Sequence, residues 1–256
     1  MTFYSRPIIE AIEAIARCGF DCAEIWTDHA WDDNRGATTE QIRAALNRTG
    51  IQATVHCPVM DINITSPNRG IREESIAQTL RAVELARDIN ARLIVVHPGR
   101  RFSLNEPVDL HWTLLVNSVS RILSHARENG MVAALENMEC DKEVVSVRFA
   151  GDVKRLLADC GVPNGHVTLD TAHMRSTQPI LDFIRDVAGQ IAHVHLSDAN
   201  AERLHLRIGD GAIDLTQVAH SLSSHGFSGV CSLECFIPNS EEMLHDELVT
   251  ARNLFK

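Results

Sequence analysis

The sequence lacks the features that mark membrane, secreted and disulfide-bonded proteins. None of its apolar runs approaches the ~20 residues of a membrane span, and residues 1–10 lack the charged-then-apolar order of a signal peptide. Seven cysteines are an odd number and no two have the CxxC spacing, so reduced, buried thiols are expected rather than a disulfide framework. We therefore expect a cytoplasmic protein that does not enter a membrane.

Positive charge is also scarce. The chain has 24 Lys and Arg against 34 Asp and Glu, which gives a formal net charge of −10 and repels a phosphate backbone. No basic and aromatic loop is present to grip a flipped-out nucleotide. The sequence therefore predicts that nucleic acid is not a partner.

Linkers rich in Pro, Gly or Ser are absent too. With 256 residues, of which 45% are apolar, the chain can bury a complete core. We predict a single domain that spans residues 1–256. The sequence leaves open whether this domain assembles into a homo-oligomer.

What the sequence does contain is a regular alternation of short apolar runs and amphipathic segments. Pro7 suits the first turn of a helix whose apolar stripe ends before Gly19, and Thr38 and Gln41 match a capping box that opens the next helix. Helices are expected at 7–18, 38–50, 71–89, 108–129, 150–159, 180–187, 214–224 and 240–254. Strands are expected at 22–26, 51–56, 93–96, 131–135, 167–169, 191–195 and 229–233.

This alternation predicts a (β/α)8 TIM barrel, an α/β fold whose active site lies at the carboxyl ends of the strands. An open, doubly wound sheet is the structural alternative, and it is disfavoured because its Gly-rich phosphate loop is missing. Before the first helix, only residues 1–4 are available to form a strand. The first strand is therefore expected to be short, or truncated because the true start lies upstream of Met1.

Six of the predicted strands run into a carboxylate or an imidazole. These residues are His56, His97, Glu136, Asp170, His195 and Glu234. In a closed barrel the strand ends meet at one mouth, and His173 and His205 lie in loops just beyond it. Acidic groups gathered there without basic partners repel one another unless a cation neutralises them. Mixed oxygen and nitrogen ligation suits a divalent ion, zinc or manganese, with cobalt also allowed.

Eight short motifs, in order along the chain, carry a family resemblance. They are Gly-Phe-Asp-Cys-Ala-Glu-Ile (19–25), Val-His-Cys-Pro (55–58), Val-Val-His-Pro-Gly (95–99), Leu-Glu-Asn (135–137), Leu-Asp-Thr-Ala-His (169–173), His-Val-His-Leu-Ser-Asp (193–198), His-Leu-Arg-Ile-Gly-Asp-Gly (205–211) and Leu-Glu-Cys (233–235). Together they resemble the xylose isomerase-like superfamily of metal-dependent barrels. That superfamily holds sugar isomerases and epimerases, inosose dehydratases and endonuclease IV-type abasic-site nucleases.

The resemblance implies which residues hold metal. In the ketose epimerase branch a single ion is held by four residues, which match Glu136, Asp170, His195 and Glu234. Two of these, Glu136 and Glu234, also move protons on opposite faces of the substrate. In the nuclease branch, residues matching His56 and His97 share Glu136 with a second ion.

A third ion of the nuclease branch is implied at His173 and His205, with an aspartate two positions before the second histidine. Here that position is Arg203, and a guanidinium cannot ligate a cation. We therefore expect Arg203 to contact an anionic or polyhydroxyl substrate. His173 and His205 remain candidates for binding either the substrate or a third ion.

Two glutamates and an electrophilic metal are what proton transfer next to a carbonyl requires. We predict a divalent-metal-dependent isomerase or epimerase that acts on a small sugar, a sugar phosphate or a related polyol ketone through an enediolate. An inosose dehydratase-type lyase would use the same groups. An endonuclease IV-type phosphodiesterase on abasic DNA is the alternative function, and a metal-binding barrel without catalysis is a third.

Other polar residues are expected to be structural. Asp198 is interpreted as a cap or a solvated charge, and His193 as a hydrogen-bonded core residue one layer below His195. For Glu24, on the strand at 22–26, a structural role is at least as well supported as a contact with substrate.

Overall fold

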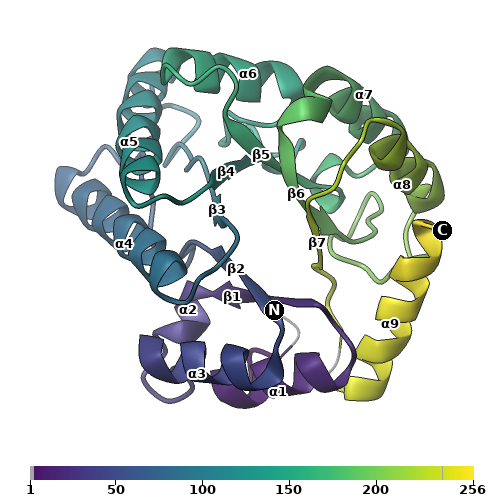
Figure 1. The fold of residues 1–256 in the computed structure, drawn as a ribbon. Coiled ribbons are helices and arrows are strands. Elements are labelled where there is room, and N and C mark those ends of the chain that lie inside the picture. Colours follow the sequence, from purple (N-terminus) through teal and green to yellow (C-terminus); the bar gives the residue numbers. More distant parts are fainter. Residues whose placement is uncertain (1–2, 238) are drawn as a thin grey trace.

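The computed structural model describes residues 3–237 and 239–256. Seven parallel strands, ordered β1 to β7 as in the chain, form one sheet that curls into a nearly closed barrel. Figure 1 shows the strands as a central ring and the helices as an outer ring. Because the spatial order follows the chain order throughout, the architecture is the predicted TIM barrel and not a doubly wound sheet.

The strands lie within two residues of the predicted ranges. They are β1 (Cys22–Trp26), β2 (Gln52–His56), β3 (Ile94–Val96), β4 (Ala133–Glu136), β5 (His166–Asp170), β6 (Ile191–Leu196) and β7 (Val230–Leu233). The middle strands β3 and β4 are buried along their whole length, as expected where a parallel sheet is covered by helices and closes on itself. Their short, continuous apolar runs follow from this burial.

Eight of the helices correspond to predicted ones and a ninth does not. The described helices are α1 (Ile8–Arg17), α2 (Thr27–Ala30), α3 (Thr39–Thr49), α4 (Arg69–Asp88), α5 (Val108–Glu128), α6 (Ala150–Asp159), α7 (Thr177–Val187), α8 (Leu215–Ser224) and α9 (Glu241–Leu254). The capping box of α3 is confirmed, since Gln41 N–H donates to Thr38 Oγ1 at 3.3 Å and Thr38 N–H donates to Gln41 Oε1 at 2.9 Å.

The single turn α2 lies in a stretch that the sequence indicated only as a loop. It is held by contacts with the neighbouring β2 segment. The hydroxyl of Thr27 donates to the carbonyl of His56 at 3.0 Å, and the carboxylate of Asp28 accepts from Val59 N–H at 2.8 Å. These are tertiary contacts, so the local pattern gave no sign of this helix.

The expected first strand falls partly outside the described residues, because residues 1 and 2 are not among them. Phe3 and Tyr4 form a turn before α1. In the described chain β1 and β7 are therefore the two ends of the sheet, and they lie next to each other in Figure 1. The hydroxyl of Ser232 on β7 donates to Glu24 on β1 at 3.2 Å and so joins the two strands.

Apolar side chains packed between the sheet and the helices form the core. Ile12 of α1, Leu135 of β4 and Phe183 of α7 are among its buried members. All seven cysteines are free thiols, as expected, but only Cys18, Cys57 and Cys235 are fully buried. None of the helices in the described chain is long and apolar enough to cross a membrane.

Candidate metal centre

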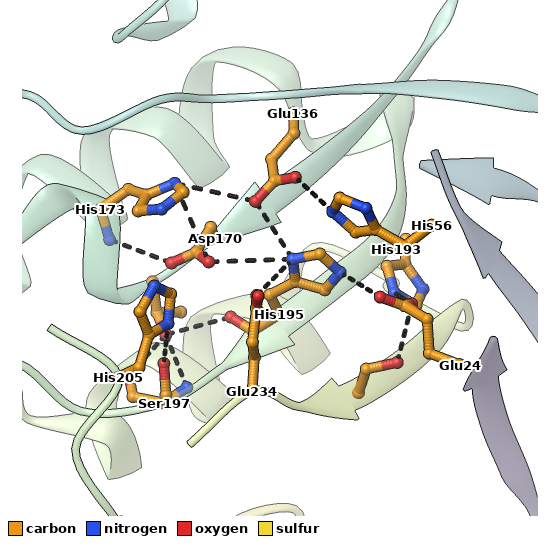
Figure 2. A network of polar contacts seen from close by, with 12 residues as sticks. Glu24, His56, Glu136, Asp170, His173, His193, His195, Ser197, His205 and Glu234 are labelled. Carbon is orange, nitrogen blue, oxygen red and sulfur yellow. Dashed lines mark hydrogen bonds and ion pairs between the residues drawn. The ribbon is translucent and has the colours of Figure 1, made fainter. Parts of the chain in front are cut away.

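Four predicted ligands converge at the carboxyl end of the barrel. They come from β4, β5 and β6 and from the residue after β7: Glu136, Asp170, His195 and Glu234. The Nδ1 atom of His195 lies 2.7 Å from Glu234 Oε2 and 3.1 Å from Glu136 Oε1. Asp170 Oδ2 lies 3.7 Å from the same nitrogen. Figure 2 shows the three carboxylates gathered around this edge of the His195 ring.

The geometry of this cluster fits a cation. One ligand atom from each of the four residues lies within 4.8 Å of the others. The oxygens Glu136 Oε2, Asp170 Oδ2 and Glu234 Oε2 are buried, and within the described chain none of them receives a well-formed hydrogen bond. Imidazole nitrogens are their nearest polar neighbours, at 2.7 Å for Glu234 Oε2 and 2.9 Å for Glu136 Oε2. Buried carboxylate oxygens that are incompletely hydrogen-bonded are costly, and a divalent ion would neutralise their charge. Three carboxylates and one imidazole suit zinc, manganese or cobalt.

The charge of His195 follows from its surroundings. Burial alone would lower the pKa of His195, but the negative charges of nearby carboxylates, Glu234 and Glu24 foremost, outweigh burial and hold this pKa well above its ordinary value. In the metal-free protein the His195 ring therefore carries a proton on each of its two nitrogens. A metal ion that binds Nδ1 has to displace one of these protons.

Metal affinity is consequently expected to rise with pH. Because the pKa of His195 lies above its ordinary value near 6.5, protons compete with the ion at neutral pH, and this competition weakens as the pH increases. Titration calorimetry with zinc and with manganese from about pH 6 to about pH 9 measures the trend. Chelation should also lower the melting temperature, since an ion that binds only the folded state stabilises it. Purified protein with almost no metal and no uptake on titration would contradict the assignment.

Glu24 on β1 belongs to this centre, although the sequence did not assign it there. Its Oε1 atom accepts a hydrogen bond from His195 Nε2 at 2.9 Å, and its Oε2 atom lies 2.7 Å from His193 Nε2. The hydroxyls of Thr54 and Ser232 also donate to Oε2, at 3.0 and 3.2 Å. With Nε2 held by Glu24, the Nδ1 atom of His195 faces the three carboxylates. A carboxylate behind a histidine is a common arrangement at metal sites.

Glu24 is ionised in this environment. Burial would raise the pKa of Glu24, but the charges of His195 and His193 hold it well below its usual value. In the sequence, the only signal for Glu24 was the alternation of side chains along the strand, which places residues 24 and 26 on the same face of β1. That signal could not show that Glu24 and His195 meet. His193 is fully buried, as expected, and its polar neighbour in this centre is the carboxylate of Glu24.

His56 and His97 form a second group with Glu136. His97 Nε2 lies 2.9 Å and His56 Nε2 lies 3.5 Å from Glu136 Oε2. His56 Nδ1 lies 2.7 Å from the carbonyl of Cys57, so an Nδ1 proton donated to that carbonyl leaves Nε2 free to face Glu136. A second ion that shares Glu136 with the first therefore fits these residues.

Asp170, His173 and His205 form a third group. The backbone N–H of His173 donates to Asp170 Oδ1 at 3.0 Å, and the ring Nδ1 lies 2.8 Å from the carbonyl of Asn137. Burial alone would lower the pKa of His173, but the charges of Asp170 and Glu136 prevail and raise it to about 9. The rings of His173 and His205 meet edge to face, with centroids 5.4 Å apart.

The loop that carries His205 is organised by Asp198. This carboxylate is buried, and it accepts four backbone N–H groups at 2.8 to 3.1 Å: those of Ala199, Gly209, Gly211 and Ile213. His205 itself has a φ of +53°, which residues other than glycine rarely adopt. Asp198 is thus structural, as expected, but it is buried in a loop and is neither solvated nor a helix cap.

Arg203 is the predicted site residue that the structure does not bring into the cluster. The other eight each belong to one of the groups described above. Arg203 is exposed, its backbone N–H donates to Asn200 Oδ1 at 2.9 Å, and among the described residues its guanidinium has no hydrogen bond or ion pair. Its contact with substrate stays a prediction.

A cavity of about 370 Å³ opens over the metal centre. Its polar walls include His56, His97, Glu136, His173, His205 and Glu234. Trp26, Val59 and Met60 supply an apolar wall. The volume lies within the ~300–1,000 Å³ usual for small-molecule sites.

The fold and the site together define a TIM barrel with a candidate metal centre at its carboxyl-terminal mouth. The chain belongs to the xylose isomerase-like TIM barrel family, whose model matches residues 12–254.

Solved structures and a curated relative give a finer comparison. The 3-keto-D-glucoside 4-epimerase from E. coli superposes with a TM-score of 0.83 at 20% identity, over 99% of this chain and 97% of that one. The D-psicose 3-epimerase from Clostridium cellulolyticum H10, solved with D-tagatose, gives a TM-score of 0.79 at 21% identity, over 97% and 94%. A probable endonuclease 4 of Mycobacterium bovis is 26% identical over 197 residues, 73% of this chain and 75% of that protein. At these identities the two epimerase structures establish the shared fold.

Proposed function

We propose that this protein is a divalent-metal-dependent isomerase or epimerase of a small sugar, a sugar phosphate or a related polyol ketone. The observation that carries the proposal is the placement of Glu136 and Glu234. Both line the cavity over the metal centre, and Figure 2 shows them on either side of His195. Two carboxylates so placed allow one to remove a proton next to a carbonyl and the other to return one. The similar solved structures are sugar epimerases, which is in line with this chemistry.

Glu136 and Glu234 are both suited to accept a proton. Burial would raise the pKa of each, but the positive charge of His195 holds both pKa values well below their ordinary range. Each is therefore ionised in the metal-free protein. During turnover one glutamate would accept a proton while the other would have to hold one in order to return it. A divalent ion held by the four ligands would stabilise the negative charge that develops on the substrate oxygen. In the reverse reaction the two glutamates exchange roles, so each alternates between an ionised and a protonated form.

The same donor set supports one or two bound ions. The four ligands of the first group suit zinc or manganese, with cobalt also allowed, and the group of His56, His97 and Glu136 accommodates a second ion. An inosose dehydratase-type lyase would use the same base on the carbon next to the carbonyl and would differ in the group that leaves.

An endonuclease IV-type phosphodiesterase is the second candidate function. It is favoured by the third group, Asp170, His173 and His205, and by the identity of 26% to a probable endonuclease 4. Two features oppose it. The net charge of −10 repels DNA, and Arg203 stands where the nuclease resemblance implies an aspartate ligand.

One assay separates these candidates. Metal-replete protein is incubated in D2O with ketoses, their phosphates and inososes, and separately with an oligonucleotide that contains an abasic site. We expect a new epimer or isomer, with deuterium at the carbon next to the carbonyl, and no cleavage of the oligonucleotide. Cleavage without any sugar turnover would overturn the proposal.

The variant Arg203→Asp tests the same distinction from the protein side. If Arg203 binds substrate oxygens, the variant should bind or turn over the sugar at least ~10-fold less well, because a charge-assisted hydrogen bond is lost. Steady-state kinetics measure this, with Lys154→Asp on the exposed side of α6 as the control for the change of charge. A gain of abasic-site cleavage together with a gain of bound metal would favour the nuclease.

A further inference from the structure

A second cavity lies beside the metal centre. It measures about 400 Å³, and its walls share Val59 and His97 with the cavity over the metal centre. The loops that follow β2, β3 and β4 enclose it. Among the ligand groups of the described chain, only His97 lines this second cavity, so it is not part of the metal centre itself.

The walls of the second cavity are largely apolar. They include Ile62, Ile64, Val96, Met138, Val144 and Val145. Arg100 and Lys142 also line it and are exposed, which places them where the cavity meets solvent. Asn63, Thr79 and Glu139 add polar groups to the lining. A wall that is mostly apolar favours a ligand part that has an apolar surface.

Hydrogen bonds between the three loops hold this cavity in shape. The side chain of Asn63 donates to the carbonyl of Arg100 at 2.7 Å and accepts from its N–H at 3.1 Å. The backbone N–H of Arg101 donates to the carbonyl of Val144 at 2.8 Å, and its guanidinium donates to the carbonyl of Glu143 at 2.6 Å. The walls are therefore preformed, and a ligand does not have to order them on binding.

We propose that the second cavity holds the non-reacting part of the substrate, and that the substrate is a sugar conjugate rather than a free monosaccharide. The inference rests on the proposed function. The cavity over the metal centre, about 370 Å³, is already large enough for the reacting sugar unit. A group attached to that sugar on the side of His97 would extend past Val59 and meet the apolar wall. An aryl or other largely apolar aglycone fits this wall.

Two unreactive probes test the inference on the metal-loaded protein. Methyl β-D-glucopyranoside and phenyl β-D-glucopyranoside differ only in the attached group, and calorimetry or ligand-observed NMR gives their affinities. We expect the phenyl glucoside to bind at least ~10-fold more tightly, since its ring leaves water for an apolar wall. Equal affinities, or no detectable binding of the phenyl glucoside, would overturn the inference.

A variant tests whether the phenyl group binds in the second cavity. Val144→Trp fills the second cavity and should reduce the affinity for the phenyl glucoside to that for the methyl glucoside, which should itself stay unchanged. Val144→Phe serves the same purpose if the larger side chain impairs folding, and Val249→Trp, on the exposed face of α9, is the control. A loss of affinity for both glucosides, or for neither, would count against this cavity. If the protein turns over free ketoses and binds the methyl and phenyl glucosides equally well, the proposed function is supported and only the inference about the second cavity is wrong.

Discussion

Glu136→Gln and Glu234→Gln are each expected to lower sugar turnover by at least ~10²-fold at full metal occupancy while the fold is retained. Glutamine keeps the size of glutamate and one acceptor oxygen, but it cannot take up a proton. Both side chains line the cavity over the metal centre, and in the metal-free protein the positive charge of His195 helps to keep both ionised. Neutralising either one removes one of the two proton-transfer groups.

The measurement is turnover at a metal concentration that saturates each variant, with circular dichroism to verify the fold. Glu202→Gln is the matched control, because Glu202 is exposed in the loop after β6 and belongs to none of the ligand groups in the described chain. Unchanged turnover in either variant at full occupancy would be decisive against the role of that glutamate.

Glu24→Gln is expected to weaken metal binding by about 10- to 100-fold, the range typical when a group behind a metal ligand is lost. The carboxylate of Glu24 accepts from His195, Thr54 and Ser232 and lies 2.7 Å from His193 Nε2. An amide in its place turns one acceptor into a donor and carries no charge, so the ring of His195 is held less firmly. We expect the variant to lose metal affinity while the melting temperature of the metal-free protein changes little.

Competition with a metal-sensitive dye gives the affinity, and the absorption spectrum of the cobalt-loaded protein reports whether the geometry of the site has changed. Ser232→Ala is the graded control, because it removes one donor to Glu24 without changing any charge. If Glu24→Gln binds metal as tightly as the parent protein and gives the same cobalt spectrum, then Glu24 does not position His195.

Much of the fold was accessible from the sequence because each β/α unit carries its own local signals. The apolar runs, the capping pairs and the glycines that end helices depend on neighbours a few residues away, and the strands fall within two residues of the predicted ranges. Seven described strands form the barrel, and the place of an eighth falls partly on residues outside the described chain. The prediction of a short first strand is therefore not tested by the described structure.

The sequence by itself determined which side chains stand at the strand ends, among them Glu136, Asp170 and His195, because alternation and strand length are local properties. Only the tertiary structure decided what those side chains meet. Closure of the barrel places Glu24 against His195, 171 residues away, and leaves Arg203 outside the cluster. It also builds the second cavity from three loops that are separate in the chain. Contacts between distant strands and loops depend on the curvature of the whole sheet, and no local pattern encodes it.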